Sequence, residues 1–126
     1  MSVNFLKRRN ILKSANALDL IPIILIKYEL AENNLVKLIV PRFQNKLLKK
    51  IFHSNKLKPE FKVTLDEIGS IVWLTIDGQK NIETIIEKMI EHFQNKGSEV
   101  NSPENRVIAF LTMLYQEDYI TFRQLE

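Results

Sequence analysis

The fold is decided by residues 65–97, which read LDEIGSIVWLTIDGQKNIETIIEKMIEHFQNKG. Asp66 is a good helix N-cap, because its carboxylate can accept hydrogen bonds from the free amides of a first helical turn. Apolar residues then recur at helical spacing as far as Gly78, which can adopt the left-handed conformation that ends a helix. Asn81 is the next capping residue, and a second amphipathic pattern follows it. The stretch therefore predicts two consecutive helices joined by a short turn.

A third helix is predicted on the C-terminal side of this stretch. Ser102-Pro103-Glu104 combines a capping residue, a proline at the first helical position and an acid beside the positive helix end. Apolar residues recur at helical spacing from Val107 to Tyr115. Tyr119 to Leu125 predicts a short final extended piece.

Strands are predicted on the N-terminal side. Ile23–Glu29 and Leu35–Val40 are apolar runs around an Asn-Asn turn, which predicts an antiparallel hairpin. Phe61–Leu65 alternates apolar and polar residues, as a half-buried strand does. Between these strands, Arg42–Phe52 has apolar residues at helical spacing with lysines on the other flank. We therefore expect an α+β chain, with three strands and a helical interlude followed by three helices.

The composition is that of one small globular domain. The chain has 126 residues, 45% of them hydrophobic and 26% charged, and it contains no cysteine. Disulfides and thiolate chemistry are thus excluded, which fits a cytoplasmic location. The longest apolar stretch, Leu18–Ile26, is far shorter than the roughly 20 residues of a membrane-spanning helix. We expect residues 1–20 to be a mobile or partner-dependent arm, and residues 21–126 to be a single domain.

Charge is distributed unevenly along the chain. Residues 1–62 carry 13 basic and four acidic residues, whereas residues 63–126 carry five basic and eleven acidic residues. The basic half suits a nucleic-acid face, a docking face for an acidic partner, or simple solvation of the surface. Its densest part is the predicted insert at residues 42–58, where the candidate docking residues are Arg42, Lys46, Lys49 and Lys50.

No set of residues for catalysis is recognisable. His53 and His92 stand apart, without the spacing of metal ligands. Asp66-Glu67 is better explained by helix capping than by paired-carboxylate chemistry. Three glycines in all are too few for a phosphate-binding loop. We therefore expect neither an enzyme, nor a metal site, nor a cofactor.

The run Leu65–Trp73, with Asp77-Gly78 and the helix start at Asn81–Ile86, resembles the PqqD family, and the resemblance extends over Phe61–Ile120. It implies a winged helix-turn-helix-like fold of three antiparallel strands and three helices. It also implies a protein that recognises ribosomally made precursor peptides. The leader of such a peptide adds as a strand to an exposed sheet edge, beside the third helix. The domain then presents the peptide to a modifying enzyme, typically a radical S-adenosylmethionine protein.

Carried over to this sequence, the resemblance implies a peptide site on one edge strand and on the third helix. The candidate residues are Phe61, Lys62, Val63, Thr64 and Leu65 on the strand, and Val107, Phe110 and Leu114 on the helix. The competing interpretation of the helix residues and of Trp73 is ordinary core packing. A proline at Val63 is expected to abolish peptide binding if the Val63 amide points outward.

The sequence is compatible with two other functions. The helical order and the basic half suit a DNA-binding protein, but the second and third helices carry many acids, which phosphate repels. The other alternative is a protein–protein adaptor that docks through the basic insert. The sequence also leaves a homodimer open.

Overall fold

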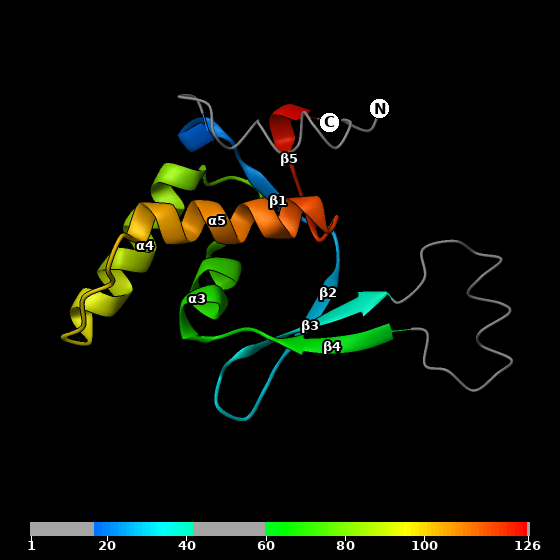
Figure 1. The fold of residues 1–126 in the computed structure, drawn as a ribbon, viewed down its shortest axis with the longest axis horizontal. Helices are drawn as coiled ribbons and strands as arrows, with labels where there is room; N and C mark the ends of the chain where they lie inside the picture. The colour runs from blue at the N-terminus through cyan, green and yellow to red at the C-terminus, as the bar shows by residue number, and fades with distance from the viewer. Residues whose placement is uncertain (1–16, 42–59, 126) are drawn as a thin grey trace, which may run out of the picture.

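The computed structural model describes residues 17–41 and 60–125 (Figure 1). In chain order its elements are η1 (Ala17–Asp19), β1 (Pro22–Ile24), β2 (Lys27–Leu30), β3 (Val36–Pro41), β4 (Glu60–Thr64), α3 (Glu67–Thr75), α4 (Ile82–Asn95), α5 (Pro103–Gln116), β5 (Ile120–Phe122) and η2 (Arg123–Leu125). The expected α+β class, with a three-stranded antiparallel sheet and three helices, is confirmed.

The main sheet has the strand order β2-β3-β4, with both pairs antiparallel. The predicted hairpin joins β2 to β3, and Asn34 takes a positive φ of 64° in its turn. Along β3, alternate residues are buried, so one face of the sheet packs on the core and the other meets solvent. The three helices gather over the packed face (Figure 1).

The expectation of one continuous strand over Ile23–Glu29 is wrong. The run divides at Leu25 and Ile26 into β1 and β2, which belong to different sheets. β1 pairs antiparallel with β5, and the Leu25 amide donates to the Tyr119 carbonyl at 2.9 Å. The division arises because the chain end returns to pair with β1, a contact between residues about a hundred positions apart that local pattern does not reveal.

The first two helices begin as predicted. The Asp66 carboxylate accepts a hydrogen bond from the Gly69 amide at 2.7 Å, and the Asn81 side chain accepts one from the Thr84 amide at 2.9 Å. Gly78 has a positive φ of 77° in the turn between α3 and α4. Local sequence therefore determines both helix starts.

The third helix begins differently from the expectation. Pro103 does occupy the first turn of α5, but Ser102 has a left-handed backbone and its side chain makes no capping hydrogen bond. A capping side chain reaches the first-turn amides from an extended backbone, and the left-handed conformation turns the hydroxyl away from them. Ser102 therefore occupies the predicted N-cap position, but its side chain does not cap the helix as expected.

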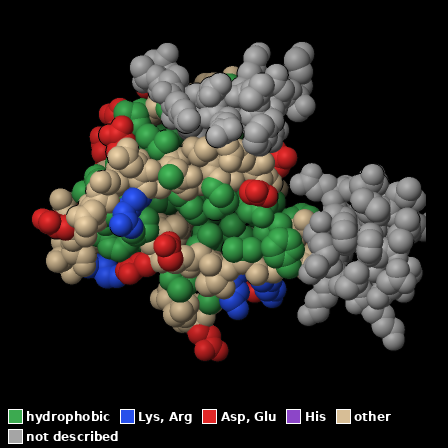
Figure 2. Space-filling view, viewed as in Figure 1, with side chains coloured by type: hydrophobic (Ala, Val, Ile, Leu, Met, Phe, Trp, Pro, Cys, Tyr) green, Lys and Arg blue, Asp and Glu red, His purple; other side chains and the backbone are tan. Residues whose placement is uncertain are grey.

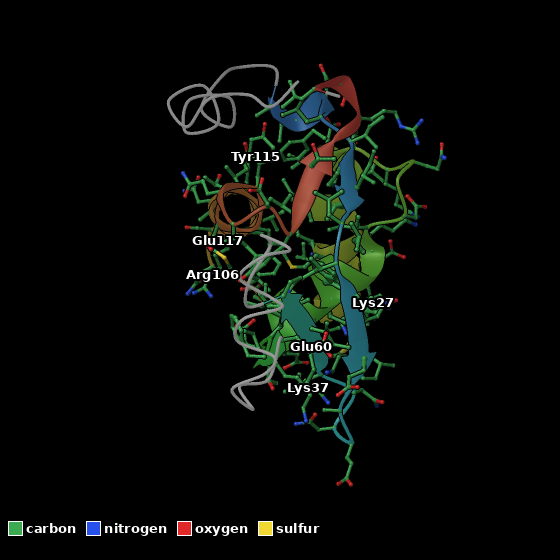
Figure 3. The ribbon with its side chains drawn as sticks, turned by 90° about the vertical axis from the view of Figure 1, so that its right-hand side faces the viewer. Lys27, Lys37, Glu60, Arg106, Tyr115 and Glu117 are labelled. Carbon is green, nitrogen blue, oxygen red and sulfur yellow. The ribbon has the colours of Figure 1, made fainter. Side chains whose placement is uncertain are left out.

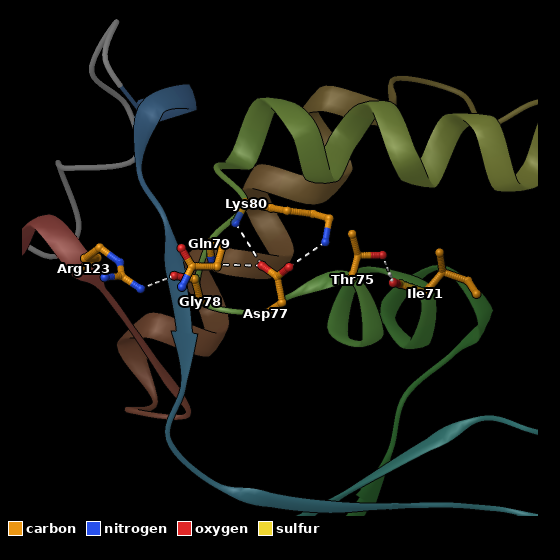
Figure 4. A network of polar contacts seen from close by, with 7 residues as sticks. All are labelled: Ile71, Thr75, Asp77, Gly78, Gln79, Lys80 and Arg123. Atoms are coloured by element: carbon orange, nitrogen blue, oxygen red, sulfur yellow. Dashed lines mark hydrogen bonds and ion pairs between the residues drawn. The ribbon is translucent and has the colours of Figure 1, made fainter.

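The turn between α3 and α4 is tied by a polar network (Figure 4). The Asp77 carboxylate accepts from the backbone amides of Gln79 and Lys80, each at 2.9 Å, and from the Lys80 ammonium at 2.6 Å. These contacts, the ammonium first, hold the pKa of Asp77 well below its usual range. The Arg123 side chain donates to the Gly78 carbonyl, which ties the C-terminal turn η2 to the same loop.

Most of the predicted arm and all of the predicted insert lie outside the described residues. Of the expected arm 1–20, the structure describes only the last four residues: Ala17 is buried, and the Leu20 carbonyl accepts from the Ile82 amide at 2.9 Å. The basic insert 42–58, with Arg42, Lys46, Lys49 and Lys50, lies wholly outside the described residues. No helix of the described part is long and apolar enough to cross a membrane.

Candidate functional site

Strand β4 lies at one margin of the main sheet. Within the described residues it pairs with β3 alone, so its other side is an edge. The alternation along an antiparallel pair decides which backbone groups face that edge. The Leu65 amide donates to the Val36 carbonyl at 2.8 Å, which makes these two residues a hydrogen-bonded pair.

The register then shows, for each residue of β4, whether its backbone groups face β3 or the open edge. Val63 opposite Leu38, and Phe61 opposite Val40, are also hydrogen-bonded pairs, because such pairs recur at every second residue. The backbone groups of Lys62 and Thr64 therefore point away from β3, toward the edge. The premise that the Val63 amide points outward is wrong, since it is directed at β3.

The side chains of β4 alternate in the same way between the two faces of the sheet. Phe61 and Val63 stand opposite buried residues of β3 and so share the helix-packed face. Lys62 stands on the solvent face, where its ammonium lies 2.8 Å from the Glu29 carboxylate of β2. The two groups stabilise each other's charged forms, which lowers the pKa of Glu29 and raises that of Lys62.

Helix α5 supplies the second wall of the candidate site. Phe110 is partly buried and comes so close to α3 that a Cβ on residue 69 would lie 3.3 Å from its ring Cζ. The absence of a side chain at Gly69 thus allows α5 to pack closely against α3. Because Leu65 borders the same spot, Phe110 lies next to the end of β4.

One further apolar side chain of α5 belongs to this surface and was missed. Met113 is 42% exposed, one helical turn beyond Phe110 on the same side. Figure 2 shows hydrophobic side chains gathered on the face that carries α5 and β4. The signal was present in the sequence, since Arg106, Phe110, Met113 and Glu117 follow one another at spacings of four, three and four.

The structure divides the predicted site residues into two groups. Val107 and Leu114 are completely buried, as is Trp73, and Leu65 is nearly so. They belong to the core and hold α5 in place. Phe61, Lys62 and Thr64 are exposed, while Val63 and Phe110 are partly buried. Among the described residues of the candidate strand and helix, the side chains that reach the surface therefore include those of the β4 edge, Phe110 and Met113.

Charge is placed at the ends of this surface. Figure 3 shows α5 end-on with Arg106 and Glu117, and Glu60 on β4 below them. Arg106 lines a hollow of about 370 Å³ together with Asp66 and Glu67. A helix surface with this mixture of signs offers little attraction to a phosphate backbone.

A buried hydroxyl links the end of β4 to the sheet and to α3. Ser70 is 2% exposed; its Oγ accepts from the Val36 amide at 2.9 Å and donates to the Leu65 carbonyl at 3.4 Å. The hydroxyl replaces the direct hydrogen bond from the Val36 amide to the Leu65 carbonyl that would complete the hydrogen-bonded pair of these two residues. It thereby fixes α3 against the sheet and lets the chain leave β4 toward the Asp66 cap.

A second hollow, of about 560 Å³, lies between the hairpin turn and helices α3 and α4. It contains the ion pair of Lys96 with Glu67 at 2.6 Å, which lowers the pKa of Glu67, and the side chain of His92. Within the described residues no three His, Asp or Glu side chains are grouped so that they could hold a metal ion.

The model of one protein family, Coenzyme PQQ synthesis protein D (PqqD), matches residues 57–120, just over half of the chain. The chain belongs to the PqqD family. The matched range contains β4, α3, α4 and α5, the elements that build the candidate site, and it ends at the first residue of β5. Membership associates this PqqD-family chain with the biosynthesis of PQQ or of another ribosomally made peptide product. Comparison with curated proteins and with solved structures gave no match.

Proposed function

We propose that this protein binds the leader of a ribosomally made precursor peptide as an added strand on β4, and presents it to a modifying enzyme of the radical S-adenosylmethionine type. It acts as a binding partner rather than as a catalyst. One observation carries the proposal: the outward backbone groups of Lys62 and Thr64 lie on the edge strand that ends at Leu65, where the Phe110 ring packs close by, and Met113 is exposed one helical turn further along α5.

The edge alone supplies modest affinity. Lys62 and Thr64 offer two amides and two carbonyls, and each backbone hydrogen bond contributes about 0.5–1.5 kcal/mol net. Four such bonds do not offset the cost of ordering a free peptide and docking it. Contacts of the peptide's side chains with Phe110 and Met113 have to supply the rest, and they also give the selectivity.

The alternation of side chains along a strand predicts which positions of the peptide are apolar and which are polar. Residues of the peptide that stand opposite Phe61 and Val63 face the helices and are expected to be apolar. Those that stand opposite Lys62 face solvent on the far side of the sheet, where polar residues are tolerated. The protein is therefore expected to select an alternating apolar–polar segment about five residues long.

Photocrosslinking in the native host tests this function. A photoreactive phenylalanine analogue is placed at Met113 in one variant and at Glu87, an exposed residue of α4, in the control. We expect mass spectrometry to recover one short peptide from the Met113 variant and not from the control. Equal recovery of the same peptides from both positions would refute the proposal.

The recovered peptide then tests the mode of binding. Synthetic copies carry N-methyl groups at alternate positions, so that one series loses the amides that face β4 and the other keeps them. We expect one series to lose binding by at least about tenfold and the other to retain it. Equal loss in both series would show that the peptide does not bind as a strand.

A further inference from the structure

The margin of the main sheet opposite β4 also exposes large apolar side chains. Tyr28 and Leu30 of β2 share the helix-packed face with their partners Leu38 and Val36, yet they are 43% and 55% exposed. The Tyr28 ring meets the ring of the buried Trp73 edge-to-face at 5.9 Å. The margin thus presents exposed apolar side chains next to one another, which is typical of an interaction surface.

Within the described residues β2 pairs with β3 alone, so the other side of its backbone is an edge along the same margin. The Ala31 amide donates to the Leu35 carbonyl at 2.8 Å, so this pair is hydrogen-bonded, and the register makes Glu29 with Lys37 the next such pair. Tyr28 and Leu30 alternate with these residues, and their amides and carbonyls therefore point away from β3. In Figure 3, β2 forms the margin of the described part of the sheet near Lys27.

The side chains of this edge are complementary to themselves. Residues 26–30 read Ile-Lys-Tyr-Glu-Leu. Placed antiparallel to an identical strand with Tyr28 at the centre, Lys27 stands opposite Glu29 and Ile26 stands opposite Leu30. Both opposite-charge pairs lie on the solvent face, whereas the tyrosines and the apolar pairs lie on the helix-packed face.

We propose that β2 pairs with β2 of a second copy of this chain, with Tyr28 of both copies on a twofold axis. This register is compatible with the hydrogen bonds of the backbone. In it the two Tyr28 residues stand opposite each other and exchange hydrogen bonds, and the amide and carbonyl of Tyr28 do point away from β3. The two sheets then join into one sheet of six strands. Tyr28 and Leu30 become buried, and each Lys27 meets the Glu29 of the second copy.

Antiparallel pairing with the same strand of a second copy is unfavourable for β4. In the register that pairs all five residues of β4 with a second β4, Lys62 would stand opposite Lys62 of the other copy, which is unfavourable. A dimer through β2 leaves both β4 edges at the outer margins of the joined sheet. The inference therefore stands apart from the proposed peptide binding, and either can fail alone.

Charge reversal tests the proposed pairing. Lys27→Glu places two acids opposite each other, and Glu29→Lys places two lysines opposite each other. We expect each variant of the full chain to raise the dimer dissociation constant at least about tenfold in sedimentation at low salt. An equimolar mixture of the two variants restores both opposite-charge pairs, so we expect it to form a heterodimer as stable as the wild-type dimer.

Lys37→Glu is the matched control, because Lys37 lies on the same face of the sheet but in the central strand, away from the axis. We expect it to dimerise as the wild type does. As a second measurement, the Tyr28 and Leu30 amides should exchange with solvent more slowly as the protein concentration rises. A wild-type chain that remains monomeric at about millimolar concentration would overturn the inference, as would a mixture of the two variants that stays monomeric.

Discussion

The two margins of the β2-β3-β4 sheet expose backbone groups in the same alternation, but the side chains that flank them differ. At each margin every second residue directs its amide and carbonyl outward: Lys62 and Thr64 on β4, Tyr28 and Leu30 on β2. Near the end of β4, helix α5 adds Phe110 and, one turn further along the helix, the exposed Met113, and a central lysine opposes self-pairing. At the β2 margin the residues on either side of Tyr28 are complementary, Lys27 to Glu29 and Ile26 to Leu30. An open edge is therefore not specific by itself, and its flanking side chains select the partner.

Helix α3 supports both margins through different residues. Ser70 bridges Val36 to Leu65 at the end of β4, whereas Trp73 lies beneath Tyr28 of β2. Variants of these residues can separate the contributions of the two margins.

The largest effect is expected from the side chain beneath β2. Trp73 is completely buried, so Trp73→Ala should lower the free energy of unfolding by about 3–5 kcal/mol, because a large cavity remains. Urea unfolding followed by circular dichroism measures this change. Leu74→Ala, one residue further and 44% exposed, is the control and should stay within about 0.5 kcal/mol. Similar losses in both variants would contradict the described packing.

The alternation along β4 is tested by two neighbouring prolines. Val63→Pro removes a donor to β3 and leaves the buried Leu38 carbonyl unpaired, so it should cost about 3 kcal/mol of unfolding free energy. Thr64→Pro removes an amide that faces the edge, so it should cost clearly less stability while weakening peptide binding. Thermal and urea unfolding give the ranking, and the reverse order would show that the deduced alternation is wrong.

A smaller loss is expected at the hydroxyl that joins β4 to α3. Ser70→Ala leaves the Val36 amide buried without its acceptor, at a cost of about 1–3 kcal/mol. Because the hydroxyl serves the β4 side, the variant should weaken binding of the recovered peptide more than dimerisation. Ser98→Ala, at an exposed position, is the matched control. An unchanged midpoint of unfolding for Ser70→Ala would show that the bridge does not stabilise the fold.

The smallest effect lies away from both margins, at the turn between α3 and α4. The depressed pKa of Asp77 means that its carboxylate stabilises the fold when ionised. This contribution is complete above the carboxyl's ordinary pKa of about 4 and is lost as the pH falls below it. Unfolding of the wild type and of Asp77→Asn should therefore differ at pH 6 and converge toward pH 2, with peptide binding equal at pH 6. A constant difference across this range would contradict the assigned role.

Much of the fold could be predicted because its signals are local. Asp66 and Asn81 act on backbone groups within a few residues of themselves and have the predicted capping roles. Gly78 takes the predicted left-handed conformation, but it lies in the turn beyond Ile76, the residue that caps the end of α3. Ser102 is different. Its residue type suits a cap, but its backbone conformation is set by the loop that precedes α5.

The candidate site could be predicted only in part. A strand and a helix do form where the sequence predicted them, but helical spacing alone could not separate the buried Val107 and Leu114 from the less buried Phe110 and Met113. That division depends on which side of α5 faces α3 and α4. It follows from the approach of Phe110 to Gly69, which joins residues 41 positions apart in the chain.

The sequence by itself determined the helices, their starts, the hairpin and the α+β class, because periodicity, capping and turn chemistry act over a few residues. It also contains the self-complementary run Ile26–Leu30. Only the tertiary structure decided that β1 leaves the main sheet to pair with β5, and which backbone groups of β2 and β4 face outward. The reason is that strand register is set by contacts between distant segments, and a shift of one residue would reverse every outward and inward group.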